Sequence, residues 1–268
     1  MTKVKAKQGE GNGTRRKESG FRVLFEMVLK ATSGEKLSRY PYWHLDLNCG
    51  SGFNTACLGS PLVFVDEAVR QGRVVYAQFC DEIPEFTTSL ASALVARRLP
   101  REFWTAVYTM DNGAFLRDFC DNVPRNAVGT IVCDPNGIGF PARELAAFCQ
   151  SHARMDLIIN LNCRTLRLVD GIRQKVNAGS NKPQFLGIVK NHPEPLARMM
   201  EWFSKPYGLI RNPLPVQGDD FSTIFLTGHS GLASAAFKGF HPMSSRIGQQ
   251  ILTNTCHVID HPIFPEME

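Results

Sequence analysis

The stretch from Tyr42 to Asn54 constrains the fold more than any other part of the chain. Aromatic and apolar residues at 42–47 are followed at once by Asn, Gly and Ser, the pattern of a buried strand that ends in a tight turn. Gly50 and Gly52 permit backbone conformations that a Cβ would forbid, and they let a ligand approach the main chain. Asp46 closes the strand with a carboxylate at the edge where open α/β sheets bind ligands.

Strand and helix patterns alternate from this stretch to about residue 163. After the first strand, further strands are expected at 73–80, 105–110, 128–133, 156–163, 209–216 and 221–228. Helices are expected at 53–58, 60–72, 85–98 and 142–154, the second with Ser60 as its N-cap. This alternation predicts an α/β, Rossmann-like fold: a mostly parallel, seven-stranded sheet with an antiparallel closing strand and helices on both faces.

Polar residues follow the next three strands. Asp81 ends the second strand, where a carboxylate suits a ribose diol because it accepts from both hydroxyls. An acidic cap for the helix that follows explains Asp81 equally well. Asp111 and Asn112 come after the third strand, and an ordinary helix cap is the simplest interpretation of Asp111. The fourth strand ends in Asp134-Pro135-Asn136-Gly137, which is also a typical turn sequence.

The spacing of Asp46, Gly50 and Gly52 resembles the first motif of class I S-adenosylmethionine-dependent methyltransferases. It differs from the NAD fingerprint, because the third glycine of that pattern would fall on Thr55. The resemblance implies that S-adenosylmethionine contacts the first strand end, the ribose site and an adenine site. The residues concerned are Asp46, Asn48, Cys49, Gly50, Gly52, Asp81, Asp111 and Asn112. The Asp-x-x-Pro spacing of Asp81 and Pro84 favours Asp81 over Glu82 for the ribose.

The fourth strand end resembles the Asp/Asn-Pro-Pro-aromatic motif of methyltransferases that act on amino groups. The resemblance implies a catalytic site at Asp134, Pro135, Asn136 and Gly137. There the Asp134 side chain and the Pro135 carbonyl would accept hydrogen bonds from the target nitrogen and orient its lone pair. Asn136 replaces the second proline, and Gly137 replaces the aromatic ring that would stack on a flipped base. Phe140 is a candidate for that ring.

Among class I methyltransferases, the sequence is most similar to the three-Cys-motif partner family of bacterial and mobile-element proteins. The similarity is carried by Leu45-Asp46-Leu47, Gly50, Gly52, Gly59-Ser60-Pro61-Leu62 and Asp134-Pro135-Asn136-Gly137. Cys49, Ser51 and Asn136 depart from the family's usual Ala-Gly-Pro-Gly loop and Asp-Pro-aromatic-Gly motif. The substrate of this family is generally not established, so the resemblance implies no particular target. On the fifth strand, Asn160 and Asn162 share a face and are candidates either for substrate contact or for bonding to backbone.

The charge of the chain is concentrated at its N-terminus. The net charge is +5, and residues 1–40 hold ten Lys and Arg against four Glu, a balance of +6. Residues 1–19 carry almost no apolar side chains and are expected to be disordered, whereas the spacing from Phe21 predicts an amphipathic helix. A basic arm of this kind binds nucleic-acid phosphates or simply aids solubility. We assign residues 1–20 to an arm, 21–230 to the α/β domain and 231–268 to a C-terminal extension.

The composition and the spacing of cysteines indicate the cellular compartment and bear on whether a metal site is expected. No run of about eighteen apolar residues and no signal-peptide pattern is present, so a membrane or secreted location is not expected. The eight cysteines form no C-x-x-C pair, which favours buried thiols in a reducing cytoplasm over disulfides or zinc. Cys256, His257 and His261 have metal-like spacing without a supporting motif, and we expect no metal there.

Together these features predict an S-adenosylmethionine-dependent methyltransferase that methylates an amino group of adenine or cytosine in nucleic acid. Two alternatives stay open. One is a catalytically silent methyltransferase-fold module that binds nucleic acid or a protein partner, favoured by the missing aromatic residue at Gly137. The other is a Rossmann-type enzyme that uses NAD, which the missing third glycine disfavours.

Overall fold

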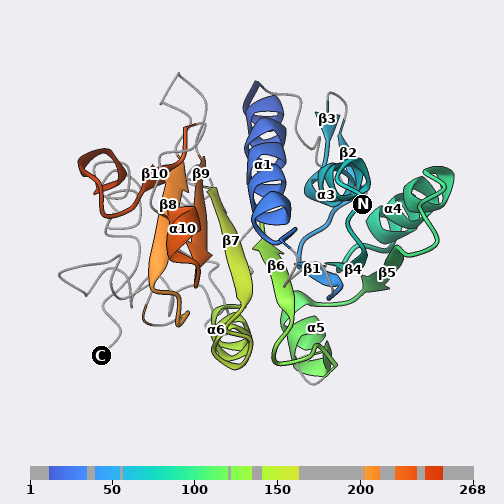
Figure 1. Ribbon diagram of the computed structural model, residues 1–268. Helices are drawn as coiled ribbons and strands as arrows, with labels where there is room; N and C mark the ends of the chain where they lie inside the picture. Colours follow the sequence, from blue (N-terminus) through green and yellow to red (C-terminus); the bar gives the residue numbers. More distant parts are fainter. Residues whose placement is uncertain are drawn as a thin grey trace, which may run out of the picture.

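The computed structural model describes residues 12–34, 40–54, 57–119, 122–134, 141–162, 201, 203–211, 221–233 and 239–249. They form one eight-stranded sheet with helices around it and a separate hairpin (Figure 1). The strands of the sheet are β1 (Tyr42–Asp46), β4 (Val75–Asp81), β5 (Trp104–Thr109), β6 (Val128–Cys133), β7 (Met155–Asn162), β8 (Tyr207–Arg211), β9 (Phe221–Thr227) and β10 (His241–Pro242). The hairpin pairs β2 (Phe53–Asn54) with β3 (Cys57–Leu58). The helices are α1 (Asn12–Ala31), α3 (Ser60–Arg70), α4 (Pro84–Ala96), α5 (Asn112–Phe119), α6 (Ala142–Ser151) and α10 (Ser230–Ala233).

Across the sheet the strand order is β10-β8-β9-β7-β6-β1-β4-β5. The strands from β7 through β6, β1 and β4 to β5 are parallel, whereas β9 is antiparallel to both of its neighbours, β7 and β8. This arrangement confirms the expected α/β fold, a mostly parallel sheet closed by an antiparallel strand. β10 adds an eighth strand, which pairs antiparallel with β8 and comes from the segment assigned to the C-terminal extension.

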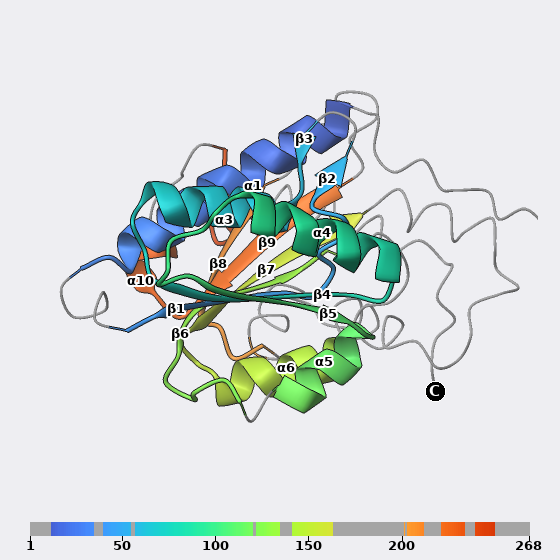
Figure 2. The ribbon, with the colours of Figure 1, turned by 90° about the vertical axis from the view of Figure 1, so that its right-hand side faces the viewer.

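Helices cover both faces of the sheet (Figure 2), and one apolar cluster lies under each layer of helices. α1, α3, α4 and α10 lie on one face, and α5 and α6 lie on the other. Alternate residues of each central strand point to opposite faces. Leu45 of β1 therefore belongs to the cluster under α5 and α6, whereas Tyr42 belongs to the cluster under α1 and α3. Burial on both faces explains why the central strands read as continuous apolar runs.

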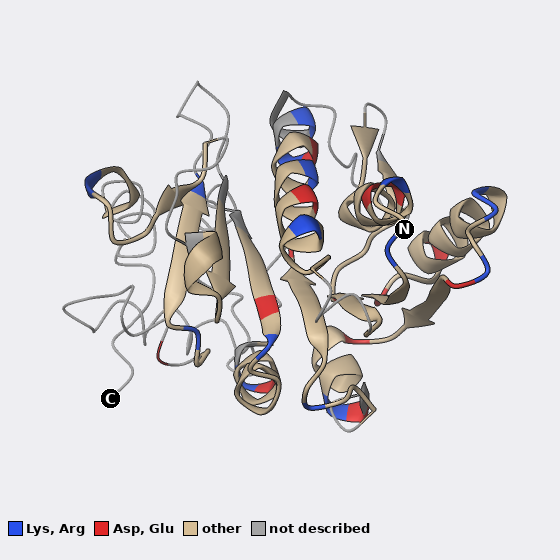
Figure 3. Ribbon diagram, viewed as in Figure 1, with Lys and Arg blue, Asp and Glu red and all other residues tan. Residues whose placement is uncertain are grey.

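The helix expected from Phe21 begins instead at Asn12. Its buried stripe is as expected, because Phe21, Leu24 and Phe25 are buried and the Phe25 ring packs edge-on against Phe64 at 5.3 Å between centroids. The difference concerns residues 12–19, which we expected to be disordered and which form the first two turns of α1. Figure 3 shows Lys and Arg positions (blue) along this helix, with Glu positions (red) between them. Residues 1–11 lie outside the described part of the chain, and the domain boundaries stay predictions.

Residues 53–58 do not form the expected short helix. Phe53 pairs with Leu58, and Asn54 pairs with Cys57, so the segment folds back as the β2–β3 hairpin. The N-cap of α3 is Gly59 rather than Ser60, because the Ser60 hydroxyl bonds to Asp46 instead of to its own helix. The expected helix end is close to the observed one, and Gly72 follows with a φ of 62°. Within the described ranges, none of the helices has the length and apolarity needed to cross a membrane.

Candidate functional site

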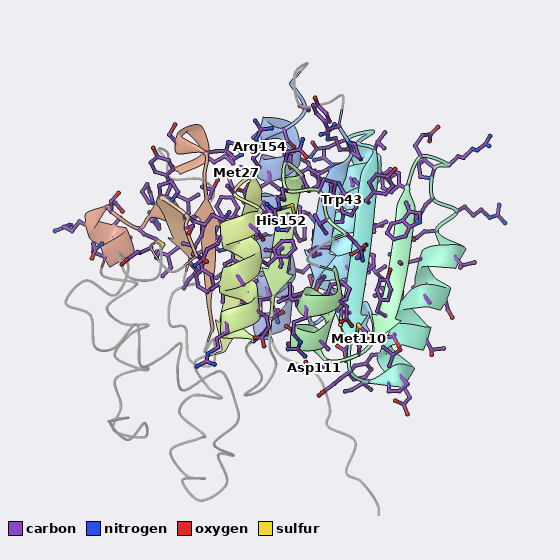
Figure 4. All side chains as sticks on the ribbon, turned by 90° about the horizontal axis from the view of Figure 1, so that it is seen from below. Met27, Trp43, Met110, Asp111, His152 and Arg154 are labelled. Carbon is purple, nitrogen blue, oxygen red and sulfur yellow. The ribbon has the colours of Figure 1, made fainter. Side chains whose placement is uncertain are left out.

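Four of the candidate carboxylates gather at one edge of the sheet. We define the carboxyl edge as the edge where β1, β4, β5, β6 and β7 end, and the amino edge as the opposite one. Asp46 and Asp81 are the last residues of β1 and β4, while Asp111 and Asp134 come just after β5 and β6. Figure 4 shows Met110 and Asp111 at the carboxyl edge, with Trp43, His152 and Arg154 toward the other end of the sheet. Ligands of open α/β sheets bind outside the carboxyl ends of the strands.

The glycine turn after β1 is tied directly to the end of β4. The Gly50 N–H donates to Oδ2 of Asp81 at 2.9 Å, and the Cys49 N–H donates to the Cys80 carbonyl at 2.9 Å. Both glycines have positive φ, 57° at Gly50 and 76° at Gly52. A Cβ on Gly50 would meet no atom within 4 Å, whereas a Cβ on Gly52 would lie 2.8 Å from Cδ1 of Leu90. The space above the turn is therefore open at Gly50, and Gly52 is needed for packing.

Asp46 is fully buried and holds the turn together from inside. Its Oδ1 accepts from the Asn48 N–H at 3.2 Å, and its Oδ2 accepts from the Ser60 hydroxyl at 2.7 Å. Burial raises the pKa of Asp46 to about 7, and repulsion from Asp134 and Asp81 acts in the same direction, whereas the two hydrogen bonds oppose it. Asp46 thus joins β1, the turn and the start of α3.

Asp81 lies at the border between the protein and solvent. Its Oδ1 accepts from the Ile83 N–H at 3.0 Å, and Ile83 is the N-cap residue of α4. Each carboxylate oxygen has a second lone-pair direction, so these main-chain bonds leave acceptor capacity for a ribose diol. The structural and the binding interpretations of Asp81 are therefore compatible. The neighbouring Glu82 is exposed.

Asp111 caps a helix, as its simplest interpretation predicts. Its Oδ1 accepts from the Ala114 N–H at 2.9 Å, in the first turn of α5. Asp111 is exposed and Asn112 is half-buried at the first position of the helix. A contact of these two residues with adenine stays a prediction.

Asp134 is buried, and its N–H and both of its carboxylate oxygens have partners. Its N–H donates to Oδ1 of Asn48 at 3.2 Å, which links the end of β6 to the glycine turn. Its Oδ1 accepts from Nδ2 of Asn160 at 2.9 Å, and its Oδ2 forms an ion pair with Nζ of Lys17. The amide oxygen of Asn160 in turn accepts from the Thr223 hydroxyl at 3.0 Å. Among the described residues, the Asn160 side chain therefore bonds to two other side chains, those of Asp134 and Thr223.

The rest of the expected catalytic motif lies outside the described residues. This applies to Pro135, Asn136, Gly137 and Phe140, and to the side chain of Asn162. It applies as well to the Cys256, His257 and His261 group. Their expected roles stay predictions.

Most of the cysteines that the structure describes are buried. Cys49, Cys80, Cys133 and Cys149 are buried thiols, and Cys57 is half-buried. Burial raises the pKa of Cys80 to about 12 and that of Cys149 to about 12, so their thiols stay protonated at neutral pH. Burial also raises the pKa of Cys133, which lies next to Asp134. A thiolate nucleophile at the carboxyl edge is therefore not favoured.

Sequence reasoning missed Lys17, Ser60 and Thr223. Lys17 falls in the segment that we expected to be disordered, yet it lies four residues before Phe21, on the same side of the helix. Extending the apolar stripe of α1 by one turn would have placed Lys17 on the buried side. Thr223 faces Asn160 across the β7–β9 pair, a long-range contact that carries no local sequence signal.

Comparison of the sequence with protein-family models gives no match, and comparison with curated proteins gives none either. Several solved structures are similar in fold. Human methyltransferase-like protein 13, in complex with SAH, is 15% identical over 94% of this chain and 94% of that chain, with a TM-score of 0.44. The METTL16 MTase domain is 12% identical over 80% of this chain and 68% of that one, with a TM-score of 0.47. An rRNA methylase from Streptococcus thermophilus is 6% identical over 82% and 98%, with a TM-score of 0.40.

Similarity at this level concerns the fold alone. The assignment of the fold rests on the strand order and on the antiparallel β9 between β7 and β8. Membership of the three-Cys-motif partner family stays a prediction.

Proposed function

We propose that this chain is an S-adenosylmethionine-dependent methyltransferase. The observation that supports it most is the bond between the Gly50 N–H and Asp81, because it joins a glycine turn and a ribose-type acceptor into one unit. The open space at the Cβ position of Gly50 suits a ligand that lies against the main chain. When bound, S-adenosylmethionine supplies an electrophilic methyl group on a sulfonium sulfur. The residues that would hold it are Asn48, Cys49, Gly50, Gly52, Asp81, Asp111 and Asn112, with Asp46 supporting the turn from beneath.

The acceptor in this proposal is an amino group of adenine or cytosine. Asp134 and the Pro135 carbonyl would accept hydrogen bonds from its two N–H groups and so direct the nitrogen lone pair toward the methyl carbon. The bound cofactor would supply the methyl group to this nitrogen, and Asp134 would hold the nitrogen in line for the transfer. One proton then leaves the methylated nitrogen for water. Nucleic acid is favoured as the substrate because the first 40 residues carry a balance of +6.

A second candidate is a catalytically silent module with the same fold. One observation favours it: the carboxylate of Asp134 is already bonded on both oxygens, to Lys17 and to Asn160. The replacement of the motif's aromatic residue by Gly137 points the same way. Such a module would bind nucleic acid or a protein partner without transferring a methyl group.

The deciding experiment for the cofactor is calorimetric titration of the wild type with S-adenosylmethionine and with S-adenosylhomocysteine. Asp81→Ala removes a charged acceptor, and hydrogen bonds to charged groups contribute about 1.5–3 kcal/mol, so its affinity should fall about tenfold to a hundredfold. Glu82→Ala is the matched control, since Glu82 is an exposed neighbour with the same charge. Equal affinities for wild type and Asp81→Ala would remove the ribose assignment, and tighter binding of NAD than of S-adenosylmethionine would overturn the cofactor.

A radiolabelled methyl-transfer assay separates the enzyme from the silent module. The wild type is incubated with labelled cofactor and with total cellular DNA, RNA or protein in separate reactions. Labelling of a nucleic-acid pool is the expected result. Cofactor binding without labelling of any pool would favour the silent module.

A further inference from the structure

The carboxylate of Asp134 is held by side chains from two elements, and a third element supports one of them. Lys17 comes from α1, Asn160 from β7, and Thr223 of β9 fixes the amide of Asn160. Each carboxylate oxygen has one of these partners, so the carboxylate plane is fixed. The main chain of Asp134 is fixed as well, through Asn48 of the glycine turn. Asp134, the residue assigned to the target nitrogen, therefore contacts both the glycine turn and the N-terminal helix α1.

Lys17 gives Asp134 a partner that the other carboxylates of this edge do not have. Within the described ranges, Asp46 is held by a hydroxyl and a main-chain N–H, and Asp81 is held by two main-chain N–H groups. Asp134 is the one of these three that forms an ion pair. Its partner Lys17 keeps 24% of its side chain exposed, against 8% for Asp134. Lys17 is therefore a charged group on the solvent side of a buried carboxylate. Its ammonium has three N–H donors, one of which can serve Asp134.

Compensation of a buried charge is the simplest role for such a pair, because an unpaired buried carboxylate is costly. That role alone does not require the second partner, Asn160, or the Thr223 hydroxyl behind it. Two donors on different oxygens fix the orientation of a carboxylate as well as its charge. Orientation is what the proposed reaction needs from Asp134, since its contribution there is to position the target nitrogen.

We propose that Lys17 is a positioning residue for methyl transfer, acting through Asp134 together with Asn160. This inference rests on the proposed function and deepens it. Lys17 and Asn160 hold the carboxylate so that its remaining lone pairs face the incoming amino group. The first turns of α1 thereby form part of the substrate side of the site, and α1 belongs to the catalytic domain rather than to a separate arm.

The test compares Lys17→Met with Lys17→Arg and with a matched control, Lys30→Met. Lys30 lies on the same helix and forms an exposed ion pair with Glu26. Initial rates of labelled methyl transfer are measured on the nucleic-acid pool that the wild type labels, with kcat and KM determined separately. Lys17→Met should lower kcat at least tenfold, with KM and cofactor affinity within a few-fold of wild type. Lys17→Arg should recover part of the rate, and Lys30→Met should behave as wild type.

A double variant separates positioning from stability. If Lys17 acts through Asp134, adding Lys17→Met to Asp134→Ala should cause no further loss of kcat. Thermal unfolding and cofactor titration of each variant show whether it is folded. Wild-type rates for folded Lys17→Met, or additive losses in the double variant, would overturn the inference while leaving the proposed function intact. If the wild type itself labels no pool, the proposed function fails and this inference fails with it.

For a variant of Lys17 that does not fold, Asn160→Ala supplies the same test from the other oxygen of Asp134. It should lower kcat and show the same lack of additivity with Asp134→Ala. Wild-type kcat in a folded Asn160→Ala variant would contradict the positioning role of the pair.

Discussion

Two buried carboxylates with lysines nearby lie at opposite ends of the same sheet. Asp134 lies at the carboxyl edge and is paired with Lys17, whereas Asp156 lies near the start of β7, at the amino edge, and is close to Lys205. The lysines differ most. Lys205 is 1% exposed, and its Nζ donates to the carbonyls of His152 and Ala153 at 3.3 and 3.0 Å. Lys17 keeps 24% of its side chain exposed.

This difference separates a structural charge from a functional one. Lys205 donates hydrogen bonds to the main chain just before β7. These bonds connect the segment that leads into β8 with the segment that leads into β7. Lys17 is paired with Asp134 just after β6, at the edge where ligands of such sheets bind. A buried carboxylate with a lysine nearby occurs at both ends. The two lysines differ in their position on the sheet and in their exposure to solvent.

The largest expected effect concerns the stability contributed by Asp156. Burial raises its pKa to about 7, while the Thr227 hydroxyl and the charge of Lys205 oppose the shift. Between about pH 4 and pH 7 the folded state holds a proton that the unfolded state has lost, so stability falls as pH rises through this range. A shift of about three units corresponds to roughly 4 kcal/mol. Asp156→Asn should remove that part of the slope.

Urea unfolding at several pH values between 4 and 8 measures this effect. The Asp156→Asn variant should keep a residual slope, because burial raises the pKa of Asp46 to about 7 as well. Asp118→Asn, which changes an exposed residue of α5, serves as the control and should follow the wild type. Parallel curves for wild type and Asp156→Asn would show that Asp156 is ionised in the folded protein throughout this range.

The next effect concerns Asp134 and the chemistry at the carboxyl edge. Asp134→Ala removes an acceptor that positions the nucleophile, so methyl transfer should slow about a hundredfold or more, equivalent to about 2.7 kcal/mol. Cofactor affinity should stay within a few-fold, because Asp134 is assigned to the substrate side. Asp134→Asn should be milder, since an amide oxygen still accepts. Labelled transfer and calorimetric titration, run on each variant, check these outcomes.

A variant at the amino edge is the control for Asp134→Ala. Asp156→Asn alters a carboxylate of similar burial far from the glycine turn, and its transfer rate at the wild-type pH optimum should match the wild type. Equal transfer rates for Asp134→Ala and wild type would reduce Asp134 to a turn residue. Equal losses in Asp134→Ala and Asp156→Asn would erase the distinction between the two ends.

The sequence predicts the strand ends well and the contacts between them poorly. Asp46, Asp81, Asp111 and Asp134 each follow a local pattern of apolar strand and polar turn, and parallel strands bring such ends to one edge without further information. The ion pair of Asp134 depends on where α1 lies across the sheet. No local pattern encodes that position, because α1 and β6 are distant in the sequence and meet only through tertiary packing.

Short segments were also ambiguous for physical reasons. The six residues from Phe53 to Leu58 are too few to separate a helical period from a strand period, and the pairing of Phe53 with Leu58 made them a hairpin. Ser60 has the chemistry of an N-cap, but the buried Asp46 carboxylate takes its hydroxyl. The first turns of α1 lack an apolar stripe, so composition alone indicated disorder, whereas Lys17 is fixed by Asp134.

The smallest expected effect concerns residues 1–11, which precede the end of α1 that carries Lys17. Three lysines lie there, at positions 3, 5 and 7, with one glutamate. If these lysines contact phosphates, replacing all three by Gln should weaken nucleic-acid binding and lower the slope of log affinity against log salt by roughly two to three. Replacing them by Arg keeps the charge and is the matched control. Anisotropy titrations of a labelled single-stranded oligonucleotide at several salt concentrations give both slopes. An unchanged slope in the Gln variant would leave solubility as the role of the arm, and the carboxyl edge would then bind substrate through the folded domain alone.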